Sequence, residues 1–209
     1  MSMNVAVAAF DVDNTLTVRD CVVPFMKSVG GVPRLLRVLF SDVGKTFQSV
    51  IRRDRDSLKI KFVQGIFAGK DAREVESLGV HFASKVADKW LRGDVASRLR
   101  WHQEQGHVVI LVSASLGTYL HPLGDLLEVD AVLCTELEEN DGFLTGKLVG
   151  QNCRGKEKAS RVQKWCQDSG IAIEDLVYAY GDSSGDTELL ELFSEPTWVN
   201  DIDLVVLVS

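Results

Sequence analysis

The sequence of 209 residues has few cysteines and no pattern that would pair them or gather them around a metal ion. Its four cysteines, Cys21, Cys134, Cys153 and Cys166, lie far apart, and none belongs to a C-x-x-C pair. This spacing indicates neither a zinc knuckle nor a disulfide framework. We therefore expect all four to be reduced thiols.

The sequence also lacks the segments that anchor a chain in a membrane or export it. No stretch approaches the roughly 18 apolar residues of a membrane-spanning helix. The first residues carry no basic region, and Asp11 interrupts the apolar run that follows, so we expect no signal peptide. Repeats and low-complexity tracts are absent as well. These features predict a cytoplasmic protein without a membrane partner.

What is present is the composition of an ordinary globular chain, with 45% hydrophobic and 25% charged residues. The formal net charge of -7 argues against nucleic acid as the main partner. The charge is unevenly distributed, because residues 21–73 carry 11 Lys or Arg against 4 Asp or Glu. This basic segment is either a solvated helix face or a surface that attracts an anionic small molecule.

Short apolar segments rich in β-branched residues alternate with helical patterns along most of the chain. The expected strands are residues 4–10, 107–113, 130–134, 176–181 and 197–200. Their near-continuous apolarity is typical of strands that are covered on both faces. The expected helices between them include residues 94–105, 156–167 and 187–193. This alternation predicts an α/β fold with a doubly wound parallel sheet.

Two segments depart from the alternation. Residues 20–88 have helical patterns and no convincing strand, so we expect an inserted α-helical cap subdomain there. The core domain would then consist of residues 1–19 and 89–209. Near residue 140, an Asn-Asp-Gly turn between segments of alternating polarity predicts a β-hairpin.

Polar side chains gather where the expected strands end and the helices begin. They are Asp11 and Asp13 after the first strand, Ser113 and Ser115 after the second, Lys158 at a helix start, and Asp182 and Asp186 in the segment GDSSGD. Ligands of open α/β sheets bind outside the carboxyl ends of the strands, so we expect these side chains to converge. Two bare carboxylates ~4 Å apart repel by about 4 kcal/mol at an effective dielectric constant of about 20. The cluster therefore needs a cation, and oxygen ligands beside a phosphate favour Mg²⁺.

This set of side chains can carry out phosphoryl chemistry. One carboxylate of the first pair can attack phosphorus to give an aspartyl phosphate, while the other protonates the leaving alcohol and later activates water. Mg²⁺ and Lys158 would offset the negative charge, and Lys156 is the alternative lysine. Ser113, which directly follows the apolar run, would donate its hydroxyl to a phosphoryl oxygen.

Four motifs in the same order resemble those of the haloacid dehalogenase (HAD) superfamily: DVDNT, VILVSAS, GKEK and GDSSGD. The resemblance implies a Rossmann-like core and a phosphomonoesterase that uses Mg²⁺. By this similarity Asp11 is the nucleophile, and Asp13 is the acid and base that also offers a backbone oxygen to the metal. Asp182 is a further metal ligand, and Asp186 binds the metal through water or orients the site. The helical insertion after the first motif resembles the C1-type cap of the phosphoserine phosphatase-like subfamily.

The resemblance leaves the substrate open. In phosphoserine phosphatases an acidic residue after the first motif holds the substrate amine, and a cap arginine holds its carboxylate. Asp20 falls at the first place and Lys61 approximately at the second, but a lysine lacks the planar two-point contact of an arginine. GDSSGD also differs from the GDGxND form of those enzymes. We expect a small phosphorylated metabolite, with phosphoserine and histidinol phosphate as candidates, and a phosphotransferase remains an alternative.

The same residues allow three other interpretations. A calcium-binding loop starting at Asp11 would need glycine at Leu16 and glutamate at Val22. The segment GDSSG matches the G-x-S-x-G turn of serine hydrolases, but that order needs a histidine after Ser183, and all four histidines precede it. A phosphate- or metal-binding scaffold without turnover is the non-enzyme alternative, because a fold does not dictate a function.

Overall fold

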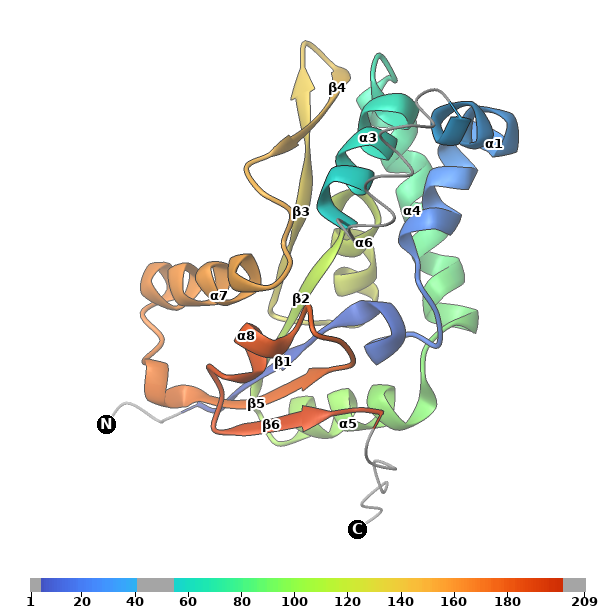
Figure 1. Cartoon of the computed structure of the whole chain (residues 1–209). Helices are drawn as coiled ribbons and strands as arrows, with labels where there is room; N and C mark the ends of the chain where they lie inside the picture. The colour runs from blue at the N-terminus through green and yellow to red at the C-terminus, as the bar shows by residue number, and fades with distance from the viewer. Residues whose placement is uncertain (1–4, 41–54, 201–209) are drawn as a thin grey trace.

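A computed structural model of the chain describes residues 5–40 and 55–200, and a six-stranded sheet forms its centre (Figure 1). In spatial order the strands are β4 (Phe143–Val149), β3 (Ala131–Asn140), β2 (Val108–Leu116), β1 (Val7–Phe10), β5 (Leu176–Gly181) and β6 (Glu195–Trp198). Every neighbouring pair is parallel except β3 with β4. The expected α/β fold is confirmed, and each expected strand is present.

Alternate residues of β1 face opposite sides of the sheet. Ala8 and Phe10 belong to one buried hydrophobic cluster, and Val7 and Ala9 belong to another. The first cluster includes residues of α5 (Gly93–Glu104) and α6 (Gly117–Leu126), and the second includes residues of α7 (Lys156–Ser169) and α8 (Thr187–Leu190). Helices therefore cover both faces, which explains the near-continuous apolarity of the central strands.

The described part of residues 20–88 is helical, as expected. Its helices are α1 (Val22–Phe40), α3 (Arg55–Phe67) and α4 (Ala72–Lys89). Helix α1 bends at Gly31, where φ is +70°, two residues before Pro33. Residues 41–54, which carry part of the basic segment, lie outside the described residues. The limits of a separate cap subdomain stay a prediction.

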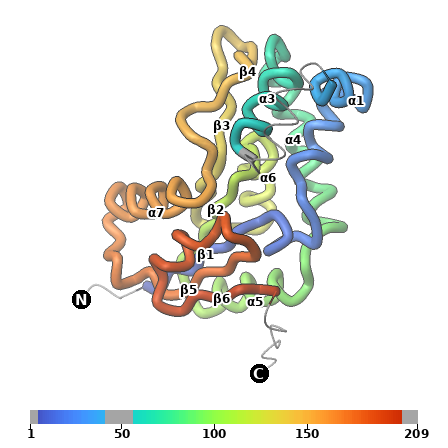
Figure 2. The backbone as a smooth tube through the Cα atoms, viewed as in Figure 1, coloured from blue at the N-terminus to red at the C-terminus, as the bar shows by residue number. Residues whose placement is uncertain are grey.

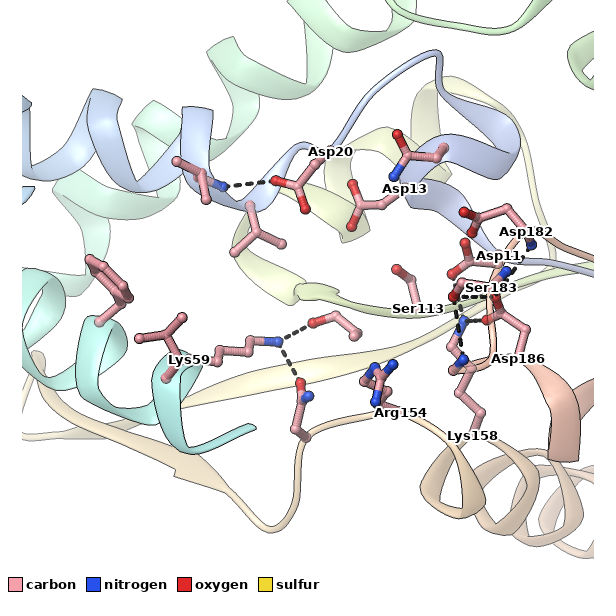
Figure 3. Close-up of a pocket in the computed structure, with 18 of the residues that line it drawn as sticks. Asp11, Asp13, Asp20, Lys59, Ser113, Arg154, Lys158, Asp182, Ser183 and Asp186 are labelled. Atoms are coloured by element: carbon pink, nitrogen blue, oxygen red, sulfur yellow. Dashed lines mark hydrogen bonds and ion pairs between the residues drawn. The ribbon is translucent and has the colours of Figure 1, made fainter. Parts of the chain in front are cut away.

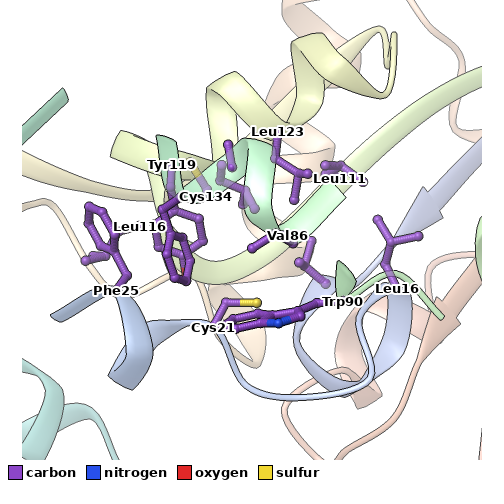
Figure 4. Close-up of a cluster of buried hydrophobic side chains, with 14 of the residues drawn as sticks. Leu16, Cys21, Phe25, Val86, Trp90, Leu111, Leu116, Tyr119, Leu123 and Cys134 are labelled. Atoms are coloured by element: carbon purple, nitrogen blue, oxygen red, sulfur yellow. The ribbon is translucent and has the colours of Figure 1, made fainter. Parts of the chain in front are cut away.

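One hydrophobic cluster joins these helices to the sheet (Figure 4). The ring of Phe25 on α1 lies 4.8 Å from that of Tyr119 on α6, and Phe82 on α4 lies 5.1 Å from the same tyrosine. Helices α4 and α6 come so close at Gly79 that a Cβ there would overlap the carbonyl oxygen of Thr118. The helical insertion thus shares the hydrophobic core of the sheet.

The predicted hairpin is formed by β3 and β4. Asp141 and Gly142 at its tip both have positive φ angles, +51° and +82°. Glycine adopts this conformation freely and aspartate more readily than most residues, so the Asp-Gly pair favours a tight hairpin turn here.

Among the helices of the described residues, none combines the length and the apolarity that a membrane span needs.

The chain path brings the ends of distant segments to one place. Figure 2 shows β1, at the start of the chain, beside β5, near its end. Ala9 pairs with Ala179 in this parallel register. The carboxyl ends of β1, β2 and β5 therefore lie at the same edge of the sheet, where the sequence places its polar motifs.

Candidate active site

The segment after β1 turns back over the end of the sheet and places two carboxylates there. The backbone N–H of Asp11 donates to the carbonyl of Tyr180 on β5, at 2.9 Å, so the parallel pairing continues to this residue. In the turn that follows, Asn14 has a φ of +63°, a conformation that asparagine adopts more readily than most residues. As a result Asp11 and Asp13 both line a pocket at the edge of the sheet.

Lys158, in the first turn of α7, lies between two of the acidic motifs (Figure 3). Its Nζ is 2.5 Å from Oδ1 of Asp11 and 2.6 Å from Oδ1 of Asp186, and the residue is only 2% exposed. Burial opposes the charged form, but these two carboxylates raise the pKa of Lys158, so it stays cationic. Lys156, by contrast, is exposed and lines a different pocket.

Three carboxylates form a cluster that suits a metal ion. Asp11, Asp182 and Asp186 each offer one oxygen, and these oxygens lie within 4.8 Å of one another. Burial raises the pKa of Asp11 to about 7, although Lys158 opposes this, and burial also raises the pKa of Asp182. Negative charge is therefore costly here without a counter-ion. The donors are all oxygens, and such a set fits Mg²⁺.

Asp186 is also fixed by the loop between β5 and α8. Its Oδ2 accepts the backbone N–H of Ser183 at 3.0 Å and the hydroxyl of the same serine at 3.1 Å. Thr15, from the first motif, donates to Oδ1 of Asp182 at 3.3 Å. The first and fourth motifs are thus connected directly as well as through Lys158.

Asp13 has a separate environment. Its carboxylate accepts the backbone N–H of Cys21 at 2.7 Å and the hydroxyl of Ser115 at 2.5 Å. Ser115 accepts in turn from the hydroxyl of Tyr119 at 2.6 Å. Burial raises the pKa of Asp13 to about 6, and the charge of Asp20 adds to this effect. A carboxyl group with such a pKa can both give and take a proton near neutral pH.

The two serines at the end of β2 face different partners. Ser113 lines the pocket together with Asp11 and Lys158, and its hydroxyl oxygen accepts the backbone N–H of Ser115 at 3.1 Å. The hydroxyl of Ser115 points to Asp13 instead. The sequence suggested Ser113 for the phosphate, and the structure places this residue in the pocket, whereas its contact with a phosphate stays a prediction. The structure also shows the contact of Ser115 with Asp13, which the sequence did not reveal.

The opposite wall of the pocket, which has a volume of about 500 Å³, comes from α1 and α3. Lys59 on α3 reaches across to the carbonyl of Ala114, to Oγ1 of Thr135 at 3.2 Å and to Oδ1 of Asn152 at 2.5 Å. Burial lowers the pKa of Lys59 to about 8. Asp20 lines the pocket too, and its side chain accepts the backbone N–H of Val23 at the start of α1, at 3.1 Å.

The structure does not place Lys61 among the described residues that line the pocket, and it places Lys59 and Arg154 there instead. Two residues separate by about 200° on a helix, so Lys59 and Lys61 face nearly opposite sides of α3. The buried positions of this helix are Val63, Ile66 and Phe67, whereas the equally apolar Ile60 is exposed, so the apolar residues alone did not define which side of the helix faces the core. Arg154, in the segment NCRGKEK, lies against Gly185, where a Cβ would be 3.0 Å from its Nε.

The serine-hydrolase interpretation finds no support in this geometry. All four histidines belong to the described residues, and none of them lines the pocket that contains Ser183. The hydroxyl of that serine donates to Asp186 and accepts the backbone N–H of Gly185 at 3.3 Å. Its role in the structure is therefore to hold the loop that carries the two acidic residues.

Comparisons with known proteins agree with the motifs. A family model for haloacid dehalogenase-like hydrolases matches residues 8–191. The protein CicA of Caulobacter vibrioides is 34% identical over 188 residues, which are 90% of this chain and 82% of that protein. A histidinol-phosphatase of Neisseria meningitidis is 30% identical over 102 residues, which are 47% of this chain and 46% of that one.

A solved structure, a phosphoserine phosphatase in its apo form, has a TM-score of 0.61 and 18% identity, and the match covers 91% of this chain and 84% of the other. At this identity the likeness concerns the fold alone. The family model and the CicA match confirm the predicted family of hydrolases. The chain belongs to the haloacid dehalogenase-like hydrolases and has the fold of their phosphoserine phosphatase-like members.

Proposed function

We propose that the chain is a Mg²⁺-dependent phosphomonoesterase that hydrolyses a small phosphorylated metabolite through an aspartyl-phosphate intermediate. The observation that carries this proposal is the buried Lys158, which touches Asp11 on one side and Asp186 on the other, beside Asp182. A solvated lysine would not be buried between two carboxylates. This arrangement concentrates charge as a phosphoryl-transfer site requires.

Asp11 is the proposed nucleophile. Lys158 contacts its Oδ1, which leaves Oδ2 for attack on phosphorus. As the new O–P bond forms, the bond from phosphorus to the leaving oxygen breaks, and Asp13 gives its proton to that oxygen. A water molecule then transfers a proton to Asp13 and attacks the phosphorus of the aspartyl phosphate, which releases inorganic phosphate and restores both carboxyl groups.

The remaining residues of the site stabilise charge. Lys158 offsets the negative charge of the nucleophile, and the hydroxyl of Ser113 donates to a phosphoryl oxygen. When held by Asp11, Asp182 and Asp186, together with a backbone oxygen of Asp13, Mg²⁺ would offset the charge of the attacking carboxylate and the phosphoryl group. The residues from α1 and α3 would cover the site and exclude bulk water during the reaction.

The pocket favours a small substrate that carries charge besides its phosphate. Apolar side chains from α1 and α3, Met26 and Phe62 among them, line it together with the cations Lys59 and Arg154 and the anion Asp20. These three charges are suited to a carboxylate and an amine. Phosphoserine has both groups, and histidinol phosphate has an amine. The named activity of the Neisseria relative supports the second candidate, although the match covers less than half of either chain.

Phosphate release from an aryl phosphate, followed by a panel of phosphoserine, histidinol phosphate and glycerol phosphate, tests the proposal. We expect release that depends on Mg²⁺ and stops with EDTA. The variant Asp11→Asn should lose turnover, because an amide cannot attack phosphorus. Lys156→Met is the matched control, since this exposed lysine of α7 lies outside the site and its loss should leave the rate unchanged.

Two outcomes would contradict the proposal. Undiminished hydrolysis by Asp11→Asn would remove the nucleophile, and no release from the entire panel with Mg²⁺ would favour the scaffold without turnover. Appearance of the phosphoryl group on an added alcohol instead of in inorganic phosphate would identify a phosphotransferase.

A further inference from the structure

A second cluster of ligating side chains lies where α6 packs against β3. Cys134 and Glu136 are two residues apart on β3, so their side chains project to the same face of the strand. His121, on α6, faces them. The sulfur of Cys134, a ring nitrogen of His121 and a carboxylate oxygen of Glu136 all lie within 4.8 Å of one another. We propose that these three side chains bind a transition-metal ion of the Zn²⁺ type.

The distances between the three donors are close to those of a tetrahedral zinc site. Nε2 of His121 lies 2.7 Å from Oε1 of Glu136, and Sγ of Cys134 lies 3.1 Å from that oxygen and 3.7 Å from Nε2. With Zn–S near 2.3 Å and Zn–N or Zn–O near 2.1 Å, neighbouring donors of a tetrahedron are about 3.4–3.6 Å apart. The donors need to separate by only several tenths of an ångström to admit the ion.

The backbone around the cluster has room for the carboxylate. A Cβ at Gly117, one helical turn before His121, would overlap the carboxylate of Glu136. The absence of a side chain at Gly117 therefore leaves space for the carboxylate of Glu136 against the start of α6. The carboxylate lies beside His121 and Cys134, because the three residues belong to two elements that pack together.

The cluster also has a path for the ion and a place for a fourth ligand. Cys134 is only 2% exposed, whereas the side chains of His121 and Glu136 are 51% and 41% exposed. A cleft lined by both residues, together with Asp125 and Glu139, opens beside them. An ion would thus enter from solvent past acidic groups, reach the buried sulfur, and keep a water molecule as its fourth ligand.

Without metal, hydrogen bonds join the three side chains of the cluster. The thiol of Cys134 and the ring N–H of His121 both donate to the same oxygen, Oε1 of Glu136. Binding of the ion replaces these two hydrogen bonds with coordination bonds. The thiol releases its proton to solvent, and His121 binds through Nε2 with its remaining proton on Nδ1, or releases a second proton if it was charged. Affinity should therefore fall as the pH is lowered.

The donor set separates this site from the active site. Among the described residues, only two clusters bring three or more such ligands together, and the other is Asp11, Asp182 and Asp186. Thiolate and imidazole select Zn²⁺ or Co²⁺, whereas three carboxylates suit Mg²⁺. The proposed site is thus independent of the proposed phosphatase reaction and has its own spectroscopic signature.

Titration of the metal-free full chain with Co²⁺ tests the proposal. We expect a thiolate-to-cobalt charge-transfer band in the near ultraviolet at one equivalent, because only a bound sulfur produces such a band. Zn²⁺ should abolish the band, and excess Mg²⁺ should leave it unchanged. Cys134→Ser should eliminate it, while Cys153→Ser, which removes another buried thiol, should keep it. Asp11→Asn should keep it too, so loss of the phosphatase site and loss of this site are distinguishable.

A second variant covers the case in which Cys134→Ser does not fold. His121→Gln alters a half-exposed side chain of α6, and it should weaken Co²⁺ binding by more than about tenfold. Absence of the band in the unmodified chain would overturn the proposal. So would a band of equal strength in Cys134→Ser, or unchanged affinity in His121→Gln.

Discussion

At the scale of single residues, the two serines at the end of β2 contact different parts of the candidate site, and we expect them to serve proton transfer and phosphate binding separately. Ser115 donates to the carboxylate of Asp13, whereas Ser113 lies beside Asp11 and Lys158. We expect Ser115→Ala to lower kcat by about tenfold, since Asp13 loses one of its two donors and general acid–base catalysis contributes about 10²–10⁴-fold in total. Inhibition by inorganic phosphate should not change in this variant.

The same measurements on Ser113→Ala should give the opposite pattern. Loss of its hydroxyl removes a donor to the phosphoryl group, so inhibition by inorganic phosphate should weaken along with kcat/KM. Steady-state kinetics with phosphate as inhibitor compares the two variants directly. Equal effects of both variants on phosphate inhibition would contradict this division of roles. Asp13→Asn serves as the reference, because it should remove nearly all turnover.

A buried histidine away from the site predicts acid sensitivity. Burial lowers the pKa of His102 to about 3, against about 6.5 in the unfolded chain, with help from the neighbouring His107 and Arg98. Between these two values the unfolded state binds a proton that the folded state does not. The free energy of unfolding should therefore fall as the pH decreases from about 6.5, by up to about 1.4 kcal/mol per pH unit.

Replacing this histidine isolates its contribution. His102→Gln should lose less stability than the unmodified chain between pH 7 and pH 5, although it is less stable at pH 7 because the contact of His102 with the hydroxyl of Tyr180 is altered. Urea denaturation at the two pH values measures this difference. Parallel losses in both proteins would show that His102 does not cause the acid sensitivity.

The site residues differ in how far the sequence could predict them. Asp11, Asp182 and Lys158 lie beside apolar strands or at a helix start within ordered motifs, and such positions converge in any parallel α/β sheet. Lys59 depends on the phase of α3, which its weak apolar pattern does not define. The cluster of His121 with Cys134 depends on how α6 packs on β3, and no spacing along the chain encodes that contact.

At the scale of elements, the close approach of α4 and α6 depends on Gly79. A Cβ here would overlap the carbonyl oxygen of Thr118, which belongs to the backbone and cannot rotate away. Alanine improves helix propensity by about 1 kcal/mol, but overpacking of this kind costs about 1–3 kcal/mol. We therefore expect Gly79→Ala to lower the free energy of unfolding, which a urea titration measures.

Ser77→Ala is the control for this prediction. Ser77 is exposed on the same helix, so its replacement should change stability by no more than about 0.5 kcal/mol. A stabilised Gly79→Ala variant would show that the two helices can separate at no cost.

The elements themselves were predictable to different degrees. The central strands are buried on both faces, so their apolar runs identify them. Helix α6 was not anticipated, since Gly117, Pro122 and Gly124 obscure its helical pattern. Gly124 is needed there because a Cβ would overlap the side chain of Val132 on β3. The glycine that lets α6 pack closely on β3 thus also weakens the helical pattern in the sequence, and for this reason the helix was not predicted.

At the scale of the whole molecule, hydrogen bonds connect α3 to the core beside the candidate active site. Asn152, in the segment before α7, accepts from Lys59 and donates through Nδ2 to Oδ1 of Asp56, at 2.5 Å. Asp56 and Lys59 both belong to α3, and Oδ1 of Asn152 also accepts from the hydroxyl of Thr135 on β3 at 2.9 Å. The insertion and the core therefore meet in a group of polar contacts beside the pocket. The position of α3 beside the pocket and the charge on Lys59 are therefore linked.

This coupling predicts how substrate binding depends on pH. Burial lowers the pKa of Lys59 to about 8, so the side chain is cationic below that value and neutral above it. For a substrate with a carboxylate, KM should therefore rise as the pH increases through about 8, because the attraction between the two charges is lost. Lys59→Met should have a raised KM that no longer changes over this range, whereas Lys61→Met should keep the pH dependence of the unmodified enzyme. The measurement is KM from pH 6.5 to pH 9.5 at constant ionic strength, and a rise that persists in Lys59→Met would assign the titration to another group.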